Sequence, residues 1–359
     1  MPDQIQKGKY TLSEILNQPV AWAETIKLVE AKAGSLLKLI AGVAEVVFTG
    51  CGSGLNVSLA LAPTFQHFTG IKAQAVPAAE VVFFPETVFT RNGDYLLVPI
   101  SRSGETTETV RACESAQARG IKTLGITCYP RSRLARYASE SLVLEPANEK
   151  SVVTTQSLTS MVLCGQVTTG IVADNAAYLR ELKSLPELGR QVIEEYQQLG
   201  RAIAENERIM KSAFVGSGPY FGLARECQLK MKEMSLLPSD AYPLFDYRHG
   251  PKSNVDQSML VTVLMSDRAG REECAFLKEM KALQGNTLAI CDRADQETRE
   301  CADYLVEVDS GLSEFARGIL YIPPVHFMAY FKSLLRGQDP DNPTNLSYWV
   351  QLSEEQRGD

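Results

Sequence analysis

Several features that would place this 359-residue chain in a specialised class are missing from its sequence. It has only three histidines, and its eight cysteines form no C-x-x-C pair. A zinc site is therefore not expected, and the thiols are typical of reduced core residues in a cytoplasmic protein. There is no basic tract and the net charge is −7, which argues against a nucleic-acid partner.

The sequence also lacks convincing membrane or export signals. The first residues, MPDQIQKGKYTL, have no apolar core of the kind that a secretory signal needs. One uncharged run, residues 151–173, is 23 residues long, but ten of these are Ser, Thr or Gln. This run is too polar for a lipid-facing helix and predicts instead a buried helix with a polar, ligand-facing start.

What the chain does contain is an internal repeat. Its length favours two domains, and hydrophobic and charged contents of 45% and 22% are typical of a globular protein. VVFTGCGSG resembles SAFVGSGPY, so that Gly52 corresponds to Gly218. YLLVPISRSGETTETV resembles MLVTVLMSDRAGREEC, which sets Ser101 against Ser266 at nearly the same offset. TLGIT and SLVLE also recur in the same order, as TLAIC and YLVEV.

Each repeat reads as strands alternating with helices. The strands are short apolar runs with almost no period-2 alternation, as expected when helices cover both faces of a parallel sheet. The sequence therefore predicts an α/β fold of two α/β/α units with open parallel sheets. We expect an N-terminal helical segment over 1–30, broken at Pro19, a first domain over 31–190 and a second over 200–359.

A cluster of hydroxyl side chains follows the apolar run YLLVPI at Ser101, Ser103 and Thr106. In open parallel sheets, ligands bind beyond the carboxyl ends of the strands, where a helix N-terminus offers unpaired N–H groups. Hydroxyls would add donors to phosphate oxygens, and Gly104 would let the backbone approach closely. The nearby GCGSG run could place Ser53 on the same ligand. The cluster predicts an anion site.

These residues allow two other interpretations. A single hydroxyl at Ser103 or Thr106 would suffice as a helix cap, with Glu105 or Glu108 favouring the helix dipole. A dinucleotide fingerprint would need a third glycine where the chain has Leu55, and no acidic residue ends the next apolar run, KAQAVP. The Walker A pattern is absent as well.

A second candidate site lies in RECQLKMKEMSLLPSDAYPLFDYRHGP, residues 225–251. Glu226, Lys230 and Glu233 are spaced i, i+4, i+7 and therefore share one face of a helix. From spacing alone, this pattern fits a solvated salt-bridge face with Lys232 at least as well as a catalytic one. His249, before Gly-Pro, would by itself be an ordinary loop residue.

The motifs SRSGETTET and GCGS, together with the repeat, resemble the sugar isomerase (SIS) domain in a tandem pair. The resemblance covers essentially the whole chain. Its pattern is similar to the isomerase half of glucosamine-6-phosphate synthase and to related amino-sugar-6-phosphate deaminases, ketose/aldose isomerases and deglycases. YTLSEILNQPVAWAET and RHGPKS resemble the deaminase and isomerase branch.

The resemblance implies which residues bind the sugar phosphate. The S-x-S-G-E-T loop of the family binds phosphate, which carries over to Ser101, Arg102, Ser103 and Thr106, with Gly52 and Ser53 from the glycine loop. The segment VVTTQSLT resembles the family's V-A-S-T-K-A-F-T, so Val152, Thr154 and Gln156 are expected to line the sugar. Gln156 stands where a lysine is common.

The resemblance also implies catalytic roles. The family pattern E-x-x-x-L-K-x-K-E makes Glu233 the residue that moves a proton between adjacent sugar carbons, with Lys230 and Glu226 on the same helix face. His249 matches the histidine that assists ring opening and reaches across a two-fold interface, so a homodimer is expected. This chemistry needs no metal or redox cofactor.

Two departures from the synthase pattern stand out. The synthase has a C-terminal lysine that forms an imine with the open sugar, and alignment on Asn345–Leu346 puts Tyr348 in its place. Tyr348 cannot form an imine. The chain also starts directly at the first isomerase repeat, so glutamine-fed amination is not expected.

We therefore predict an isomerase or deaminase of a hexose 6-phosphate, in particular of an amino sugar 6-phosphate, which interconverts aldose and ketose and releases ammonia from a 2-amino substrate. The alternatives are a deglycase of sugar-phosphate–amino acid adducts and a non-catalytic phosphosugar-binding module. The second alternative is less favoured because such modules usually carry one copy of the domain fused to a DNA-binding domain.

Overall fold

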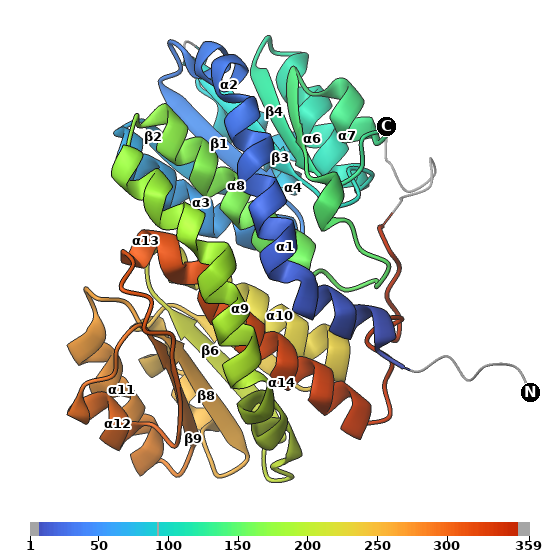
Figure 1. Ribbon diagram of the computed structural model, residues 1–359. Helices are drawn as coiled ribbons and strands as arrows, with labels where there is room; N and C mark the ends of the chain where they lie inside the picture. Colours follow the sequence, from blue (N-terminus) through green and yellow to red (C-terminus); the bar gives the residue numbers. More distant parts are fainter. Residues whose placement is uncertain (1–6, 92, 351–359) are drawn as a thin grey trace, which may run out of the picture. The chain divides into compact units, whose positions relative to one another are not determined.

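The computed structural model describes residues 7–91 and 93–350, and its ribbon is drawn in Figure 1. The chain divides into two compact units made of interleaved segments. One comprises the described residues of 20–149, 156–183 and 347–350, and is called here the phosphate-loop unit because it contains residues 101–106, which the sequence predicts to bind phosphate. The other comprises residues 7–19, 150–155 and 184–346, and is called the catalytic-helix unit because it contains the helix predicted to carry the catalytic residues. Two long helices, α1 (Lys9–Ala31) and α9 (Ala176–Glu205), contribute residues to both units.

The phosphate-loop unit is built on a five-stranded parallel sheet in the order β2-β1-β3-β4-β5. Its strands are β1 (Glu45–Gly50), β2 (Lys72–Pro77), β3 (Tyr95–Ile100), β4 (Lys122–Thr127) and β5 (Glu140–Val143). Its helices are α2 (Ala33–Ile40), α3 (Ser53–Thr69), α4 (Ala78–Phe83), α5 (Pro85–Val88), α6 (Thr107–Gln117), α7 (Arg133–Tyr137) and α8 (Gln156–Val172), with a 3-10 turn over Glu145–Ala147.

Helices cover both faces of this sheet, which explains why its strands are apolar throughout. Val47 and Leu97 pack with α4 and α6 residues on one face. Val46, Phe48 and Leu96 lie on the opposite face with residues of α3 and α8. Every residue of β3 is buried. Consecutive strand residues are therefore buried on alternate faces, as a doubly covered parallel sheet requires.

The catalytic-helix unit repeats this arrangement with the strand order β10-β9-β8-β6-β7, again all parallel. Its strands are β6 (Lys211–Gly216), β7 (Ser239–Tyr242), β8 (Met259–Leu264), β9 (Asn286–Cys291) and β10 (Tyr304–Glu307). Its helices are α10 (Pro219–Ser235), α11 (Gly270–Ala282), α12 (Gln296–Cys301), α13 (Glu314–Arg317) and α14 (Ile322–Leu335), with 3-10 turns over Asp246–Arg248, Pro251–Asn254 and Gly318–Tyr321.

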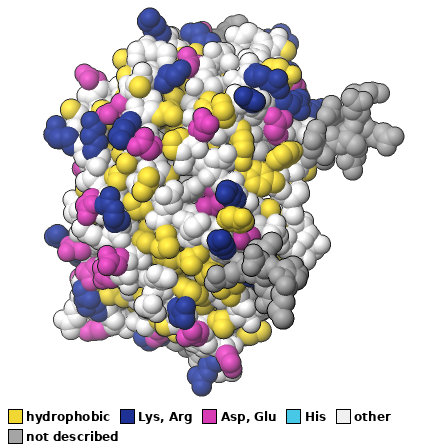
Figure 2. Space-filling model, turned by 45° about the vertical axis from the view of Figure 1, so that its right-hand side comes forward, with side chains coloured by type: hydrophobic (Ala, Val, Ile, Leu, Met, Phe, Trp, Pro, Cys, Tyr) yellow, Lys and Arg dark blue, Asp and Glu magenta, His cyan; other side chains and the backbone are white. Residues whose placement is uncertain are grey.

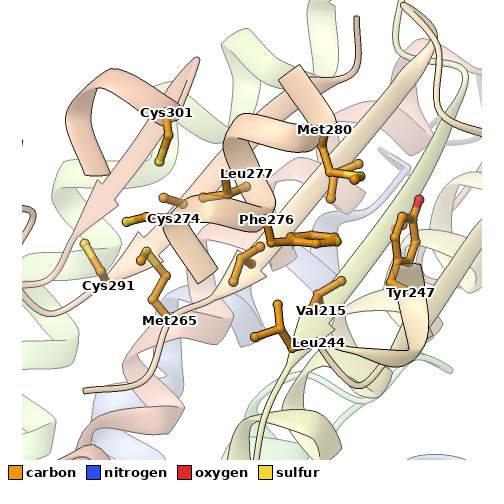
Figure 3. Packing of buried hydrophobic residues seen from close by; sticks show 14 of the residues in the cluster. Val215, Leu244, Tyr247, Met265, Cys274, Phe276, Leu277, Met280, Cys291 and Cys301 are labelled. Carbon is orange, nitrogen blue, oxygen red and sulfur yellow. The ribbon is translucent and has the colours of Figure 1, made fainter. Parts of the chain in front are cut away.

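The core on one face of this second sheet is shown in Figure 3. Phe276, Leu277 and Met280 of α11 pack on Val215 of β6, and Tyr247 closes one side of the cluster. Cysteines 274, 291 and 301 belong to the same cluster. All eight cysteines of the chain are free, and seven are buried. Burial raises the pKa of the Cys291 thiol to about 12, so this thiol is a core group and not a nucleophile.

The predicted α/β class with two parallel-sheet units is confirmed, and so is the internal repeat. Gly52 and Gly218 take nearly the same backbone conformation, with φ of 53° and 56°, directly before α3 and α10. Such positive φ values favour glycine. The uncharged run 151–173 forms the buried helix α8, and no helix among the described residues is long and apolar enough to span a membrane.

One element was predicted wrongly. Pro19 does not break the N-terminal segment, because α1 runs through it as one helix of 23 residues. A proline frees the carbonyl four residues earlier, here that of Ile15. The side-chain amide of Gln18 donates to this carbonyl at 2.9 Å and replaces the missing bond. Ile15 and Trp22 are fully buried on either side, so packing also holds the helix together.

Candidate functional site

The order of the first sheet places the hydroxyl cluster at a position suited to a ligand. In a sheet of order 2-1-3-4-5, β2 is added on one side of β1, and β4 and β5 are added on the opposite side, next to β3. The connections after β1 and β3 therefore leave in opposite directions, and ligands bind beyond the carboxyl ends of these two strands. The glycine loop, residues 50–53, follows β1, and the loop from Ser101 to Thr106, called here the phosphate loop, follows β3. The two loops are therefore neighbours.

Three hydroxyls of the phosphate loop converge. Ser101 Oγ lies 3.1 Å from Thr106 Oγ1 and 3.4 Å from Ser103 Oγ. The same oxygens order the loop, because the N–H of Gly104 donates to Ser101 Oγ and the N–H of Glu105 donates to Ser103 Oγ, both at 3.1 Å. Ser101 and Ser103 are buried, and α6 begins at the next residue after Thr106. Three donors focused at a helix N-terminus suit a phosphate group.

Gly104 gives this loop its shape. Its φ is +64°, and a Cβ at this position would lie 2.7 Å from Thr127 Oγ1 and still closer to Ser132. The loop is also fastened to α7, since the carboxylate of Glu105 accepts from the N–H of Arg133 at 2.8 Å. Glu105 therefore supports a neighbouring helix instead of its own.

The side chain of Arg102 is buried among protein groups. Its guanidinium forms an ion pair with Glu149 at 3.4 Å and donates to the backbone carbonyl of Tyr348 at 2.8 Å. The side chain of Arg102 is 6% exposed and that of Glu149 is fully buried. Ser157 of α8 also donates to the Glu149 carboxylate. Within this unit, Gln156 donates to the carbonyl of Asn148 at 2.6 Å and is buried.

The catalytic-helix unit contains the second set of predicted residues. Glu226, Lys230 and Glu233 do share one face of α10, and Lys230 bridges the two carboxylates at 3.2 Å and 2.5 Å. Its third hydrogen bond goes to Thr154 Oγ1, at 3.0 Å. The side chains of Glu226 and Lys230 are 1% exposed, whereas that of Glu233 is 20% exposed. This is not a solvated salt-bridge face.

The charges of this cluster compensate one another. Burial lowers the pKa of Lys230, but the carboxylates of Glu233 and Glu226 outweigh this effect and leave the pKa above its usual value. Lys230 is therefore a charged ammonium, and a buried charge of this kind is tolerated only when it is paired and hydrogen-bonded. Glu233 is the one member of the cluster that a ligand in solvent can reach.

The segment that carries Val152 and Thr154 is held by residues that sequence reasoning missed. Glu14 of α1 accepts from the N–H of Lys150 at 2.6 Å and from the backbone and hydroxyl of Ser151. The N–H of Val152 donates to the carbonyl of Asp341 at 2.9 Å. Glu14 and Lys150 are 136 residues apart in the chain, so no local pattern could have indicated this contact.

His249 lies on an exposed loop between the two 3-10 turns of the catalytic-helix unit. Its imidazole makes no hydrogen bond to any described residue. The loop is anchored on both sides of His249, because Arg248 and Lys252 each form an ion pair with Glu279 of α11, at 2.7 and 2.8 Å. Phe245, on the same loop, is 60% exposed.

The second repeat has lost most of the anion-binding features of the first. At the loop after β8, Ser266 keeps its role and accepts from the N–H of Ala269 at 3.0 Å. The residues that correspond to Ser103 and Thr106, however, are Arg268 and Arg271. The signs of the loop ion pair are exchanged as well, because Asp267 on this loop pairs with Arg317, whose side chain is buried while that of Asp267 is exposed. This loop lacks two of the three hydroxyl donors.

Two doubly covered parallel sheets, with a hydroxyl-rich loop at the switch point of one of them, place the chain among the open-sheet α/β proteins, which bind ligands beyond the carboxyl ends of their strands. The chain matches the family model described as the SIS domain over residues 39–169 and 205–329. It belongs to the SIS domain family, as the motifs predicted.

Comparison with curated proteins identifies a relative that is similar over nearly the whole of this chain. The glutamine–fructose-6-phosphate aminotransferase (isomerizing) of Pyrobaculum aerophilum is 30% identical over 355 residues, which cover 96% of this chain and 58% of that protein. The chain thus spans less than two thirds of the length of the curated relatives it matches.

Solved structures share the fold over nearly the whole chain. Tagatose-6-phosphate ketose/aldose isomerase from Escherichia coli has a TM-score of 0.85 at 22% identity, covering 93% of this chain and 95% of that one. Glucosamine-6-phosphate deaminase from Thermotoga maritima has a TM-score of 0.72 at 27% identity, covering 91% and 99%.

Proposed function

We propose that this protein is a sugar-phosphate isomerase or amino-sugar-6-phosphate deaminase that acts on a hexose 6-phosphate. The observation that carries the proposal is the cluster on α10, where the partly exposed Glu233 is the only reachable member of an otherwise buried charge network. The family and the activities named for its relatives, a ketose/aldose isomerase and a deaminase among them, support it.

In the proposed mechanism Glu233 transfers one proton. Its carboxylate removes the proton from C2 of the open-chain aldose and returns it to C1, while a second proton passes from the C2 hydroxyl to O1, which yields the ketose. If C2 carries an amino group, the product is an imine, and its hydrolysis consumes water and releases ammonia. Lys230 orients the carboxylate, and Thr154 fixes Lys230. Ser101, Ser103 and Thr106 bind the phosphate, with Ser53 of the glycine loop beside them, and supply binding energy remote from the reacting carbons.

The experiment that tests this function uses glucosamine 6-phosphate and fructose 6-phosphate as substrates. Ammonia release, hexose phosphate interconversion and exchange of the C2 hydrogen with solvent deuterium are measured for the wild type and for Glu233→Gln. The variant keeps the size of the side chain but cannot accept a proton, so exchange should fall by about 10²–10⁴-fold while sugar phosphate still binds. Lys232→Gln, an exposed neighbour on the same helix, is the matched control and should stay within a few-fold of wild type.

Exchange at an undiminished rate in Glu233→Gln would contradict the assignment of the base. Turnover of a fructosyl–amino acid 6-phosphate, with no turnover of either test substrate, would instead favour a deglycase.

We also propose a homodimer in which His249 of each protomer serves the site of the other. An exposed loop with a solvent-facing Phe245 and an imidazole without a partner among the described residues supports this. The test mixes two inactive variants, Glu233→Gln and His249→Ala, after dissociation and reassembly. If the sites are composite, half of the dimers are mixed and each has one intact site, so about a quarter of wild-type activity returns. If each protomer uses its own histidine, none returns.

A further inference from the structure

The C-terminal segment 347–350 is attached to the phosphate loop through Tyr348. The Tyr348 ring lies under the Arg102 guanidinium, with 4.0 Å between the guanidinium carbon and the ring centroid. The backbone carbonyl of Tyr348 accepts from the same guanidinium. Further along the segment, the carbonyl of Val350 accepts from the N–H of Thr107, at 3.5 Å.

The hydroxyl of Tyr348 makes two hydrogen bonds. It lies 2.6 Å from the hydroxyl of Tyr129, which follows β4, and it donates to the backbone carbonyl of Glu149 at 2.5 Å. The two tyrosine rings meet edge to face, with centroids 6.1 Å apart. Tyr348 therefore contacts Arg102 with its face and both Tyr129 and Glu149 with its hydroxyl.

This arrangement gives Arg102 a role other than contact with an anion. Its side chain is 6% exposed, and the charge of its guanidinium is compensated by a fully buried carboxylate. A cation stacked on an aromatic face away from water is held more strongly than an exposed one. Because Arg102 lies between Ser101 and Ser103 in the chain, fixing its side chain also fixes the backbone from which both hydroxyls project.

We propose that Tyr348 is a positioning residue of the phosphate loop, which acts by clamping Arg102 against Glu149. The proposal rests on the proposed function, because it assumes that the loop binds phosphate. The clamp organises the three hydroxyls before the ligand arrives, so less ordering has to accompany binding. Tyr348 thus improves phosphate affinity without touching the phosphate.

Thermodynamic linkage makes the effect reciprocal. If docking of the 347–350 segment strengthens phosphate binding, bound phosphate must strengthen docking of the segment by the same factor. Trp349 can report this, because it is 42% exposed and lines a hollow of about 290 Å³ together with Ser103 and Tyr129. The only other tryptophan, Trp22, is buried and bonded to Thr159, so its emission is a constant background.

The test measures binding of inorganic phosphate and of fructose 6-phosphate by calorimetry and by tryptophan fluorescence. The variants are Tyr348→Phe, which keeps the ring but loses the hydroxyl, and Tyr348→Leu, which loses both. Tyr137→Leu is the matched control, since Tyr137 also stacks on an arginine but is 43% exposed. We expect Tyr348→Leu to weaken both ligands about tenfold and Tyr348→Phe to weaken them a few-fold. The control should bind as the wild type does.

A positioning role also predicts a particular kinetic pattern. KM should rise in both Tyr348 variants while kcat at saturating substrate stays within about twofold of wild type, since the proton-transfer group is untouched. In the wild type, phosphate should shift the emission of Trp349, and this shift should need more phosphate in Tyr348→Phe.

Wild-type affinity for phosphate in Tyr348→Leu would overturn the inference, as would a loss of kcat with unchanged phosphate binding. If the wild-type protein binds neither inorganic phosphate nor fructose 6-phosphate, the proposed function itself fails and the inference fails with it. The two failures are therefore distinguishable.

Discussion

At the scale of single residues, the phosphate loop allows a direct test of what a hydroxyl contributes. Ser103→Ala removes one of the three converging donors and leaves the buried backbone in place. A hydrogen bond to a charged group contributes about 1.5–3 kcal/mol, so phosphate affinity should fall by about tenfold or more. Calorimetric titration with fructose 6-phosphate measures it. Ser115→Ala, on α6 where Ser115 bonds to the carbonyl of Val81, is the control. Unchanged affinity in Ser103→Ala would reduce the cluster to helix capping.

Gly104 offers a second residue-scale prediction. Gly104→Ala should destabilise the protein and weaken phosphate binding, because the new Cβ meets Thr127 and Ser132 in addition to the cost of positive φ. Gly120→Ala is the matched control, with φ of +74° and nothing near its Cβ. Urea unfolding of both variants separates the free-energy cost of steric contact from the cost of a positive φ. The control should lose about 1 kcal/mol, and Gly104→Ala clearly more. Equal losses would contradict the crowding explanation.

Not every residue of the candidate site could be predicted from the sequence. Ser101, Ser103 and Thr106 were predicted because strand, loop and helix follow one another directly in the chain. The clamp on Arg102 was not predicted, because Tyr348 lies 246 residues away from it. A contact of that separation depends on how the chain is folded, and no local spacing encodes it.

At the scale of elements, α10 shows how burial decides between two interpretations of one pattern. The i, i+4, i+7 spacing of Glu226, Lys230 and Glu233 correctly predicted a shared face, but spacing alone could not say whether that face is solvated. The sequence could not reveal that Thr154 would satisfy the last donor of Lys230.

Removal of the Lys230 ammonium should therefore lower the free energy of unfolding substantially. Lys230→Met removes the ammonium that pairs with the carboxylate of Glu226, whose side chain is 1% exposed, and breaking a buried pair in this way costs about 3–5 kcal/mol. Thermal unfolding should show a large loss of stability, together with a loss of turnover. Lys232→Met, at an exposed position of the same helix, should change neither by much. A stable Lys230→Met protein would mean that Glu226 becomes protonated without cost.

At the scale of the whole molecule, the duplication explains why most of the fold was predictable. Two copies of one pattern reinforce each other, so strands such as β3 and β8 could be identified from matched apolar runs. The distribution of charge on the surface gives little further indication of function. On the face drawn in Figure 2, acidic and basic side chains are interspersed without a large region of one sign. The differences between the two copies were less predictable. In the first repeat Arg102 of the loop pairs with Glu149, whereas in the second repeat an acidic loop residue, Asp267, pairs with Arg317.

The last prediction concerns the stability of the whole chain as a function of pH. Glu273 of α11 is fully buried, accepts from the N–H of Ser266 at 2.9 Å, and has no partner for its other oxygen among the described residues. Burial raises the pKa of Glu273 from 4.5 to about 8, and the carboxylates of Glu314 and Asp267 add to this. The folded protein therefore keeps a proton that the unfolded chain has already released.

Because the folded-state pKa is the higher one, the protonated Glu273 supports folding fully below about pH 4.5 and loses that effect as the pH rises towards about 8. In this window the free energy of unfolding should fall by up to about 1.4 kcal/mol per pH unit on account of this group. Glu273→Gln, which stays neutral, should flatten the decline and be more stable than wild type near pH 8, with little difference near pH 5. Urea unfolding at intervals across the window measures this, with Glu272→Gln as the exposed neighbouring control. Parallel curves for the wild type and Glu273→Gln would show that Glu273 is ionised in the folded protein.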